Sequence, residues 1–220
     1  MPRFIWFDPI PPGAVQTVTR SYRASYADTT SATTYTFTGC DIGTAVAGRV
    51  VVVAVETHTL DNKLNRTLSS GTIGGAAAGV RVTAGTTAYG TASIMSLVVA
   101  AGATATITVT MNGATDGCAI HVYALYGAAS ATPTDTASAT DSSATTIDIP
   151  AGGVCIGCAY NRTQGVTWTL TSIVEDAHAD FDVAAYCTGS VESLIAQTGA
   201  SVRLLPSTIL TTRQAFAAWG

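Results

Sequence analysis

Residues 103–113 read ATATITVTMNG, and the side chains of this stretch alternate between two kinds. Threonine takes every second position from 104 onward, at Thr104, Thr106, Thr108 and Thr110, and none of the residues is charged. Because successive side chains of a strand point to opposite faces, Ile107, Val109 and Met111 share the face opposite these hydroxyls. The pattern predicts a β-strand with one face in a core and a hydroxyl-coated outer face.

Short apolar segments of the same kind recur along the chain from Thr33. RVVVVAVETH (49–58) and CAIHVYALYG (118–127) have the composition of strands, and SSGTIGG (69–75) ends in two glycines that suit a hairpin turn. Roughly a dozen short strands with turns every 8–12 residues are typical of an all-β, antiparallel β-sandwich, jelly-roll or Greek-key-like. The one segment that suggests a turn or two of helix is SVESLIAQT (190–198).

The first 32 residues differ from the rest of the chain. They begin MPRFIWFDPIPPG, rich in aromatic residues and proline, and continue into a polar stretch. Proline does not fit a central strand and favours extended backbone. We therefore expect residues 1–32 to form an extended N-terminal arm and residues 33–220 a single β-sandwich domain. The arm's apolar side chains would anchor it in a groove of its own domain or of a neighbouring subunit: Phe4, Ile5, Trp6 and Phe7.

Charged residues make up 11% of the chain, against roughly 25% in ordinary soluble proteins. The formal net charge is −4 and Lys63 is the only lysine, so the sequence offers no basic stripe for a nucleic acid. Apolar runs such as VVVAV (51–55) are far shorter than the roughly 18 residues that span a bilayer. We expect neither a nucleic-acid nor a membrane partner. The start of the chain does not resemble a secretory signal, so we expect synthesis in a cytosol.

A threonine-coated outer face with so few charges has two interpretations. Charged side chains on faces and edges normally keep soluble proteins apart. A surface that packs against copies of itself avoids the cost of burying ions, so the composition fits an assembling subunit. A threonine-rich β-domain that works as a monomer fits the same composition.

Four segments carry a resemblance to a known family: YTFTGCDIGTAVAGRVVVVAV (35–55), TIGGAAAGV (72–80), ATATITVT (103–110) and HVYALYGAASATPTDTAS (121–138). Together they resemble small β-sandwich virion structural proteins of tailed bacteriophages, encoded among the head and tail genes. The resemblance covers about half of the chain, and its motifs consist of strand and turn residues. It implies a structural subunit, most simply a capsid-decorating or head accessory protein, located in the virion after synthesis in the host bacterial cytoplasm. The implied partners are copies of itself, for example as a trimer, and other virion proteins.

Five cysteines, an odd number, do not suggest a disulfide framework. Cys40, Cys118 and Cys187 stand alone among apolar and threonine residues, which predicts buried thiols. Cys155 and Cys158 form a CxxC motif, but VCIGCAY alternates as a strand does, so the two thiols should point to opposite faces. We therefore expect neither a zinc site nor a redox pair there.

An acidic segment, VEDAHADFD, gathers potential ligands around His178. Carboxylates spaced along an extended loop can hold Ca²⁺, which takes oxygen ligands. A solvated acidic turn explains the same residues, so both interpretations stay open. The candidate calcium ligands are Glu175, Asp176, Asp180 and Asp182.

No motif in the sequence indicates an enzyme or a cofactor. His58 and His121 lie in expected strands, and no GxSxG nucleophile elbow is present. The alternative function is a tail-tip or fibre module that binds host-surface carbohydrate through segment 129–146, which we expect to be a long surface loop. A depolymerase is a third possibility, without a catalytic cluster to support it.

Overall fold

The computed structural model describes residues 17–60, 66–84, 89–140, 143–181, 184–206 and 212–220. Throughout these ranges the regular structure is antiparallel β-sheet, as the sequence pattern predicts. The same ranges contain no helix that could cross a membrane. Sixteen strands are described: β1 (Thr19–Asp28), β2 (Ala32–Asp41), β3 (Val50–His58), β4 (Leu68–Ile73), β5 (Ala76–Ala84), β6 (Gly90–Val98), β7 (Thr104–Thr115), β8 (Gly117–Tyr126), β9 (Asp135–Ala139), β10 (Thr145–Ile149), β11 (Gly153–Asn161), β12 (Trp168–Thr171), β13 (Val174–Phe181), β14 (Ala184–Ser193), β15 (Gln197–Pro206) and β16 (Thr212–Trp219).

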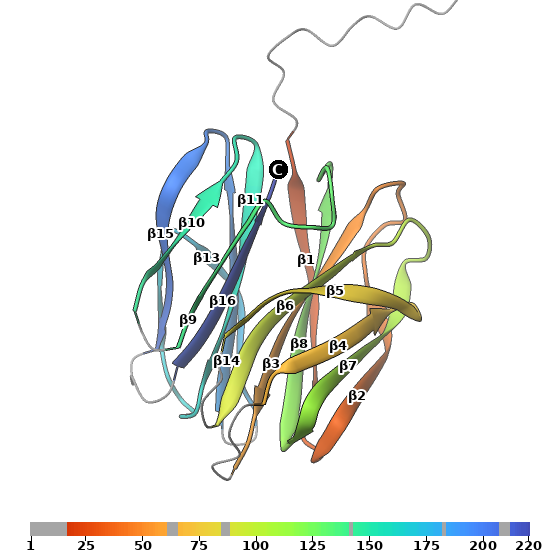
Figure 1. The fold of residues 1–220 in the computed structure, drawn as a ribbon, viewed down its shortest axis with the longest axis vertical. Helices are drawn as coiled ribbons and strands as arrows, with labels where there is room; N and C mark the ends of the chain where they lie inside the picture. Colours follow the sequence, from red (N-terminus) through yellow and green to blue (C-terminus); the bar gives the residue numbers. More distant parts are fainter. Residues whose placement is uncertain (1–16, 61–65, 85–88, 141–142, 182–183, 207–211) are drawn as a thin grey trace, which may run out of the picture.

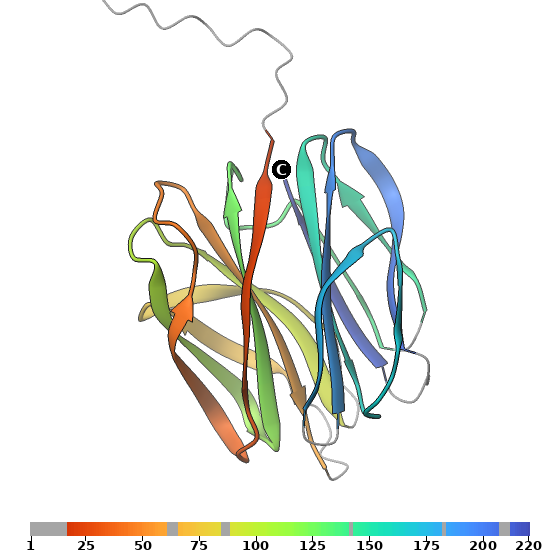
Figure 2. The ribbon, with the colours of Figure 1, turned by 180° about the vertical axis from the view of Figure 1, so that it is seen from behind.

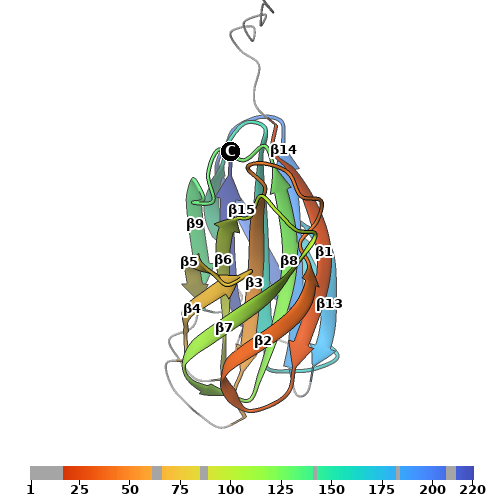
Figure 3. The same cartoon turned by 90° about the vertical axis from the view of Figure 1, so that its right-hand side faces the viewer.

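The strands form three sheets that divide along the chain. The first eight strands make one sheet in the order β1-β8-β3-β6-β5-β4-β7-β2, which curls into a nearly closed barrel (Figures 1 and 3). The later strands make a five-stranded sheet, β13-β14-β11-β16-β9, and a three-stranded sheet, β10-β15-β12. Figure 1 shows the eight-stranded sheet on the right and the later strands on the left, with the C-terminus beside the start of β1. The view from behind shows β1 lying along β8 (Figure 2).

Three large apolar cores, and a small fourth cluster around Tyr160 and Tyr186, fill the spaces inside and between these sheets among the described residues. The first lies inside the curled eight-stranded sheet and contains Phe37, Val53, Ile107 and Val122 among others. The second lies between the eight-stranded and five-stranded sheets and includes Val52, Ile94, Leu125, Ile156 and Trp219. The third lies between the five-stranded and three-stranded sheets and includes Ile149, Cys187, Leu204 and Phe216. The sheets are therefore stacked, and the five-stranded sheet in the middle has a core on each of its faces.

Strand β3 shows how one sequence serves two cores. All of its residues are buried, with Val51, Val53 and Val55 in the first core and Val50 and Val52 in the second. A strand buried on both faces needs an unbroken apolar run rather than an alternation. The run VVVVAV supplies it, which accounts for the central position of β3 between β8 and β6.

Strand β7 confirms the interpretation of ATATITVTMNG. Ile107, Val109 and Met111 are buried in the first core, while Thr104 and Thr106 are exposed. The expected hairpin is present too, between β4 and β5. Gly74 and Gly75 have φ of 62° and 81°, values that glycine adopts without a side-chain clash.

The expected boundary of the N-terminal arm at residue 32 is wrong. Residues 19–28 form β1, which pairs with β8 from Thr19↔Tyr126 to Asp28↔Cys118. The segment looked like an arm because it is polar. At the end of the sheet order, however, a strand needs few large apolar residues, and half-buried Tyr22 and Tyr26 supply its contacts with the second and first cores. The residues before 17, with the expected anchor Phe4–Phe7, lie outside the described residues.

Three further expectations need correction. Segment 129–146 is not one long loop, because it contains β9 and the start of β10. Residues 190–198 do not form helical turns: they are the end of β14, a bend and the start of β15. Residues 174–181 of the acidic segment form strand β13 rather than a loop or turn. In each case cross-strand hydrogen bonding to a neighbour distant in sequence decides the structure over weak local propensity.

The two faces of β7 allow a matched pair of substitutions. We expect Ile107→Ala to lower the free energy of unfolding by about 2–5 kcal/mol, because it leaves a cavity in the first core. Thr106→Ala, on the exposed face of the same strand, should change it by about 0.5 kcal/mol or less. Urea denaturation of both variants measures the difference. Equal effects would contradict the assignment of the two faces.

Candidate functional site

The outer surface of β2, β7 and β4 carries a regular array of hydroxyl groups. The register places Thr34, Thr110 and Ser70 side by side in one row. The next row contains Thr36, Thr108 and Thr72. The hydroxyls of Thr34 and Thr110 are 3.3 Å apart, within hydrogen-bond distance. We call these six residues the hydroxyl face; none of them is charged, and each is exposed or half-buried.

The candidate calcium ligands do not converge among the described residues. Glu175 contacts the His178 ring across 2.5 Å, and the Asp180 carboxylate accepts a hydrogen bond from the backbone N–H of Gly165. Asp176 has other partners, Arg20 and Tyr123. Asp182 lies outside the described residues. In the part of the chain that is described, no cluster of three or more His, Cys, Asp or Glu side chains forms a metal site.

The predicted burial of the cysteines and the opposite orientation of the two CxxC thiols are confirmed. Cys155 lies in the third core and Cys158 in the second, so the CxxC thiols face opposite sides of β11. All five cysteines are buried and none forms a disulfide. Burial raises the pKa of the Cys155 thiol to about 12, which keeps it protonated and unreactive at neutral pH.

A chain of polar side chains crosses from the surface of β1 into the space between the two larger sheets. The exposed Ser25 hydroxyl lies 2.6 Å from Nδ1 of His121 on β8 and 2.6 Å from the hydroxyl of Tyr22. Nε2 of His121 faces Oε2 of Glu56 on β3 at 3.5 Å. Exposed fractions fall to 1% for His121 and 0% for Glu56. The order from outside to inside is therefore Ser25, His121, Glu56, with the half-buried Tyr22 beside Ser25.

The inner end of this chain is short of hydrogen bonds. Both carboxyl oxygens of Glu56 and Nε2 of His121 are buried with no hydrogen-bond partner, and 3.5 Å is too long for a good hydrogen bond. Burial raises the pKa of the Glu56 carboxyl well above its usual range and lowers the pKa of His121 to about 4. Burial therefore favours the neutral form of each group.

A second polar cluster joins the same two sheets. The Asp176 carboxylate pairs with the Arg20 guanidinium at 3.2 Å and accepts a hydrogen bond of 2.9 Å from Tyr123. The Ser190 hydroxyl donates to the same carboxylate. Asp176 was a candidate calcium ligand from the sequence. The structure gives it a different role, linking β13 to β1, β8 and β14.

The sequence contained part of the signal for this region. Glu56 and His121 are ionisable residues inside otherwise apolar strand sequences, VVVVAVETH and CAIHVYALYG, and such residues are buried at a cost. The sequence predicts that His121 lies in a strand but indicates no partner for its ring. Nothing in the sequence connected it to Ser25, which is 96 positions away.

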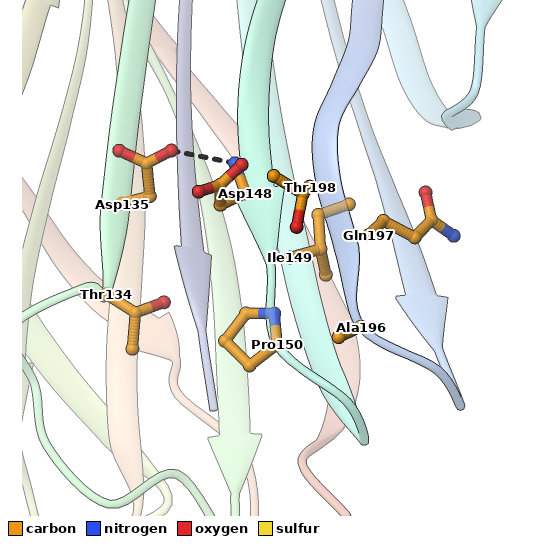
Figure 4. A pocket seen from close by; sticks show the side chains of 8 residues that line it. All are labelled: Thr134, Asp135, Asp148, Ile149, Pro150, Ala196, Gln197 and Thr198. Carbon is orange, nitrogen blue, oxygen red and sulfur yellow. Dashed lines mark hydrogen bonds between the residues drawn. The ribbon is translucent and has the colours of Figure 1, made fainter.

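A surface pocket lies where β9, the β10–β11 turn and β15 meet (Figure 4). Its volume is about 250 Å³, and two carboxylates from neighbouring strands border it. Asp135 accepts a 2.7 Å hydrogen bond from the backbone N–H of Asp148, and Asp148 accepts a 2.6 Å bond from the N–H of Gly199. Ile149 and Pro150 contribute apolar surface. The pocket thus combines hydrogen-bond acceptors with an apolar side.

Comparison with protein-family models, curated proteins and solved structures finds no match to this chain. Three local features of the described structure bear on function: the hydroxyl face, the Ser25–His121–Glu56 chain and the pocket beside Asp135.

The buried Glu56 predicts a specific dependence of stability on pH. Folding raises the pKa of Glu56. Its contribution to the free energy of unfolding is therefore fully present below the pKa of the unfolded chain, about 4.3, and is lost as the pH rises to the pKa of the folded protein. His121, with a lowered pKa, acts in the opposite direction between about pH 4 and its unfolded value of about 6.5. Above about pH 6.5 His121 no longer adds a rise in the free energy of unfolding that would offset the loss caused by Glu56.

We therefore expect the free energy of unfolding to fall, relative to that of Glu56→Gln, as the pH rises above about 4.3, with a slope of at most about 1.4 kcal/mol per pH unit. Glu56→Gln removes the ionisation while nearly keeping the size of the side chain, so its curve should be flatter. Urea denaturation across this pH range measures both curves. Parallel curves for the two proteins would show that Glu56 does not titrate as described.

Proposed function

We propose that this protein is a structural subunit of a bacteriophage virion, in the first place a capsid-decorating or head accessory protein. The observation that carries the proposal is the hydroxyl face on β2, β7 and β4. Together with the sequence resemblance to virion proteins, it favours a subunit whose outer sheet surface packs against other proteins. The partners are copies of itself, in a symmetric oligomer such as a trimer, and neighbouring virion proteins.

The physical reason is the cost of desolvation. Burying a charged side chain at an interface costs much free energy of desolvation unless the charge is paired. Threonine hydroxyls cost less to desolvate, and they can hydrogen-bond to each other. The rows Thr34–Thr110–Ser70 and Thr36–Thr108–Thr72 offer donors and acceptors without charge. With 11% charged residues in the whole chain, little electrostatic repulsion opposes the contact.

In this proposal the stacked sheets act as a β-sandwich of the jelly-roll or Greek-key kind, with an extended N-terminal arm. The arm is now shortened to the residues before β1. Its apolar side chains at positions 4–7 would dock on a neighbouring subunit. Burying such a side chain contributes about 1.5–3 kcal/mol, so four of them suffice for firm attachment.

A charge on the hydroxyl face tests this proposal. We expect Thr36→Glu to fold normally and to abolish self-association and incorporation into particles, because it buries an unpaired carboxylate. Thr169→Glu places the same charge on another exposed strand threonine, in β12, and should assemble as the unaltered protein does. Sedimentation velocity over a concentration series and particle incorporation measure the outcome.

Two results would contradict the assembly role. One is an unaltered protein that stays monomeric at high concentration and does not join particles. The other is a Thr36→Glu variant that assembles as well as the Thr169→Glu control.

The pocket in Figure 4 favours a second candidate function, a tail-tip or fibre module that binds host-surface carbohydrate. Two of its lining residues, Thr134 and Asp135, belong to segment 129–146, where the sequence suggested sugar binding. Carboxylate acceptors beside an apolar surface suit the hydroxyls and the C–H face of a sugar. The volume is smaller than the roughly 300 Å³ of pockets for drug-sized ligands, which fits one sugar unit.

A glycan array followed by titration tests the carbohydrate candidate. If a glycan binds, Asp148→Asn should weaken the binding about tenfold or more, because a charged acceptor is lost. Asp28→Asn is the control, since that carboxylate also accepts a backbone N–H bond but lies outside the pocket. No signal on the array, or equal binding by both variants, would remove this candidate.

A further inference from the structure

Ser25, His121 and Glu56 follow one another in the order of a nucleophile, a base and a carboxyl group beside the base. The Ser25 hydroxyl and Nδ1 of His121 are 2.6 Å apart, within the range for direct proton transfer. The other ring nitrogen of His121 faces Glu56 at 3.5 Å. Such an arrangement is recognised by its geometry rather than by sequence order or motif.

A β-bulge in β1 creates this arrangement. The register with β8 shifts between Tyr22 and Ala24, so that Tyr22 is opposite Tyr123 and Ser25 is opposite His121. In a regular strand, residues three apart point to opposite faces. The extra residue brings Tyr22 and Ser25 to the same face, where their hydroxyls are 2.6 Å apart. Bulges often re-aim side chains in this way next to active sites.

The buried end of the chain has no structural explanation of its own. Glu56 is fully buried, and neither of its oxygens has a hydrogen-bond partner. A carboxyl group buried in this way costs free energy that an apolar residue would not. Its position beside Nε2 of His121 gives it a role, because a charge that forms on the imidazole would be stabilised there.

We propose that Ser25 is the nucleophile and His121 the general base of an esterase site for short-chain acyl esters, with Glu56 as the carboxyl group that stabilises the charge formed on His121. The reactive tautomer carries its ring proton on Nε2, towards Glu56, which leaves Nδ1 free to accept the Ser25 proton. Ser25 is exposed on the terminal strand of its sheet, so a small acyl group reaches its hydroxyl from solvent. The proposal is independent of the virion role, which uses a different surface.

The chemical steps balance with water as the only co-reactant. Ser25 Oγ bonds to the ester carbonyl carbon while its proton passes to Nδ1 of His121, and the Tyr22 hydroxyl donates a hydrogen bond to the negatively charged carbonyl oxygen. The bond to the leaving alcohol breaks, and the alcohol takes the proton from His121. Water then attacks the acyl-serine with the same base and releases the carboxylic acid. The proton returns to Ser25.

The rate of the Ser25 reaction should depend on pH through the ionisation of Glu56. The titratable side chains around it are Tyr22, Cys118, Cys158 and Cys187, and burial raises the pKa of all four. They stay neutral below about pH 9, while the nearby Asp176 is paired with Arg20. As Glu56 ionises with rising pH, its carboxylate stabilises the imidazolium that forms on His121. The reaction of Ser25 should accelerate over the same range.

The test uses the full chain, p-nitrophenyl acetate as substrate and a fluorophosphonate probe whose attachment site is mapped by mass spectrometry. We expect the probe on Ser25 of the unaltered protein. Ser25→Ala should lose both labelling and hydrolysis, while Ser69→Ala, a control at another exposed strand serine, should keep both. His121→Gln should slow labelling about 100-fold or more. Glu56→Gln should make the pH profile of labelling flat.

Ser25 is exposed, so its alanine variant tests the proposal without disturbing the core; circular dichroism checks the folding of the variants at buried positions. An absence of label on Ser25, or label spread over exposed serines such as Ser69, would overturn the proposal. Unchanged labelling in folded His121→Gln would overturn it as well. A rising pH profile that persists in Glu56→Gln would remove the role given to Glu56.

Discussion

The packing of the eight-stranded sheet against the five-stranded sheet is the contact on which the rest of the structure depends. Strands β3, β6 and β8 on one side and β11 and β16 on the other each send alternate side chains into this space. The other faces of the same strands fill the first or the third core. Loss of the middle contact would therefore expose one apolar face of each of these two sheets at once, at about 25 cal/mol for every Å² of apolar surface.

The polar groups between the sheets follow from this packing. Strand β3 is buried along its whole length, so Glu56 near its end is removed from water along with the valines. The other polar groups at this boundary are better matched: Asp176 pairs with Arg20 and accepts from Tyr123, and the Tyr123 hydroxyl lies 2.7 Å from that of Thr188. The Asp176 carboxylate has charged and hydroxyl partners, whereas both carboxyl oxygens of Glu56 have no hydrogen-bond partner, and this contrast separates a structural link from a candidate chemical site.

Two surfaces of the molecule thus have different physical character. The hydroxyl face is outer sheet surface with neutral groups at regular cross-strand positions, which suits contact with another protein. The edge at β1 is irregular, with a bulge that gathers Tyr22, Ser25 and His121 at one point. Both depend on strand pairing between distant parts of the chain, since β2 pairs with β7 and β1 with β8.

The sequence alone determined the β-class, the two faces of β7 and the opposite orientation of Cys155 and Cys158. These properties follow from local alternation, because side-chain direction in a strand has a period of two residues. Tertiary structure decided that residues 19–28 and 174–181 are strands, since polar edge strands are held by hydrogen bonds to partners that no local pattern reveals. It also decided which ionisable groups meet: the carboxylates of the acidic segment separate, whereas Ser25, His121 and Glu56 come together from three strands through register and a bulge.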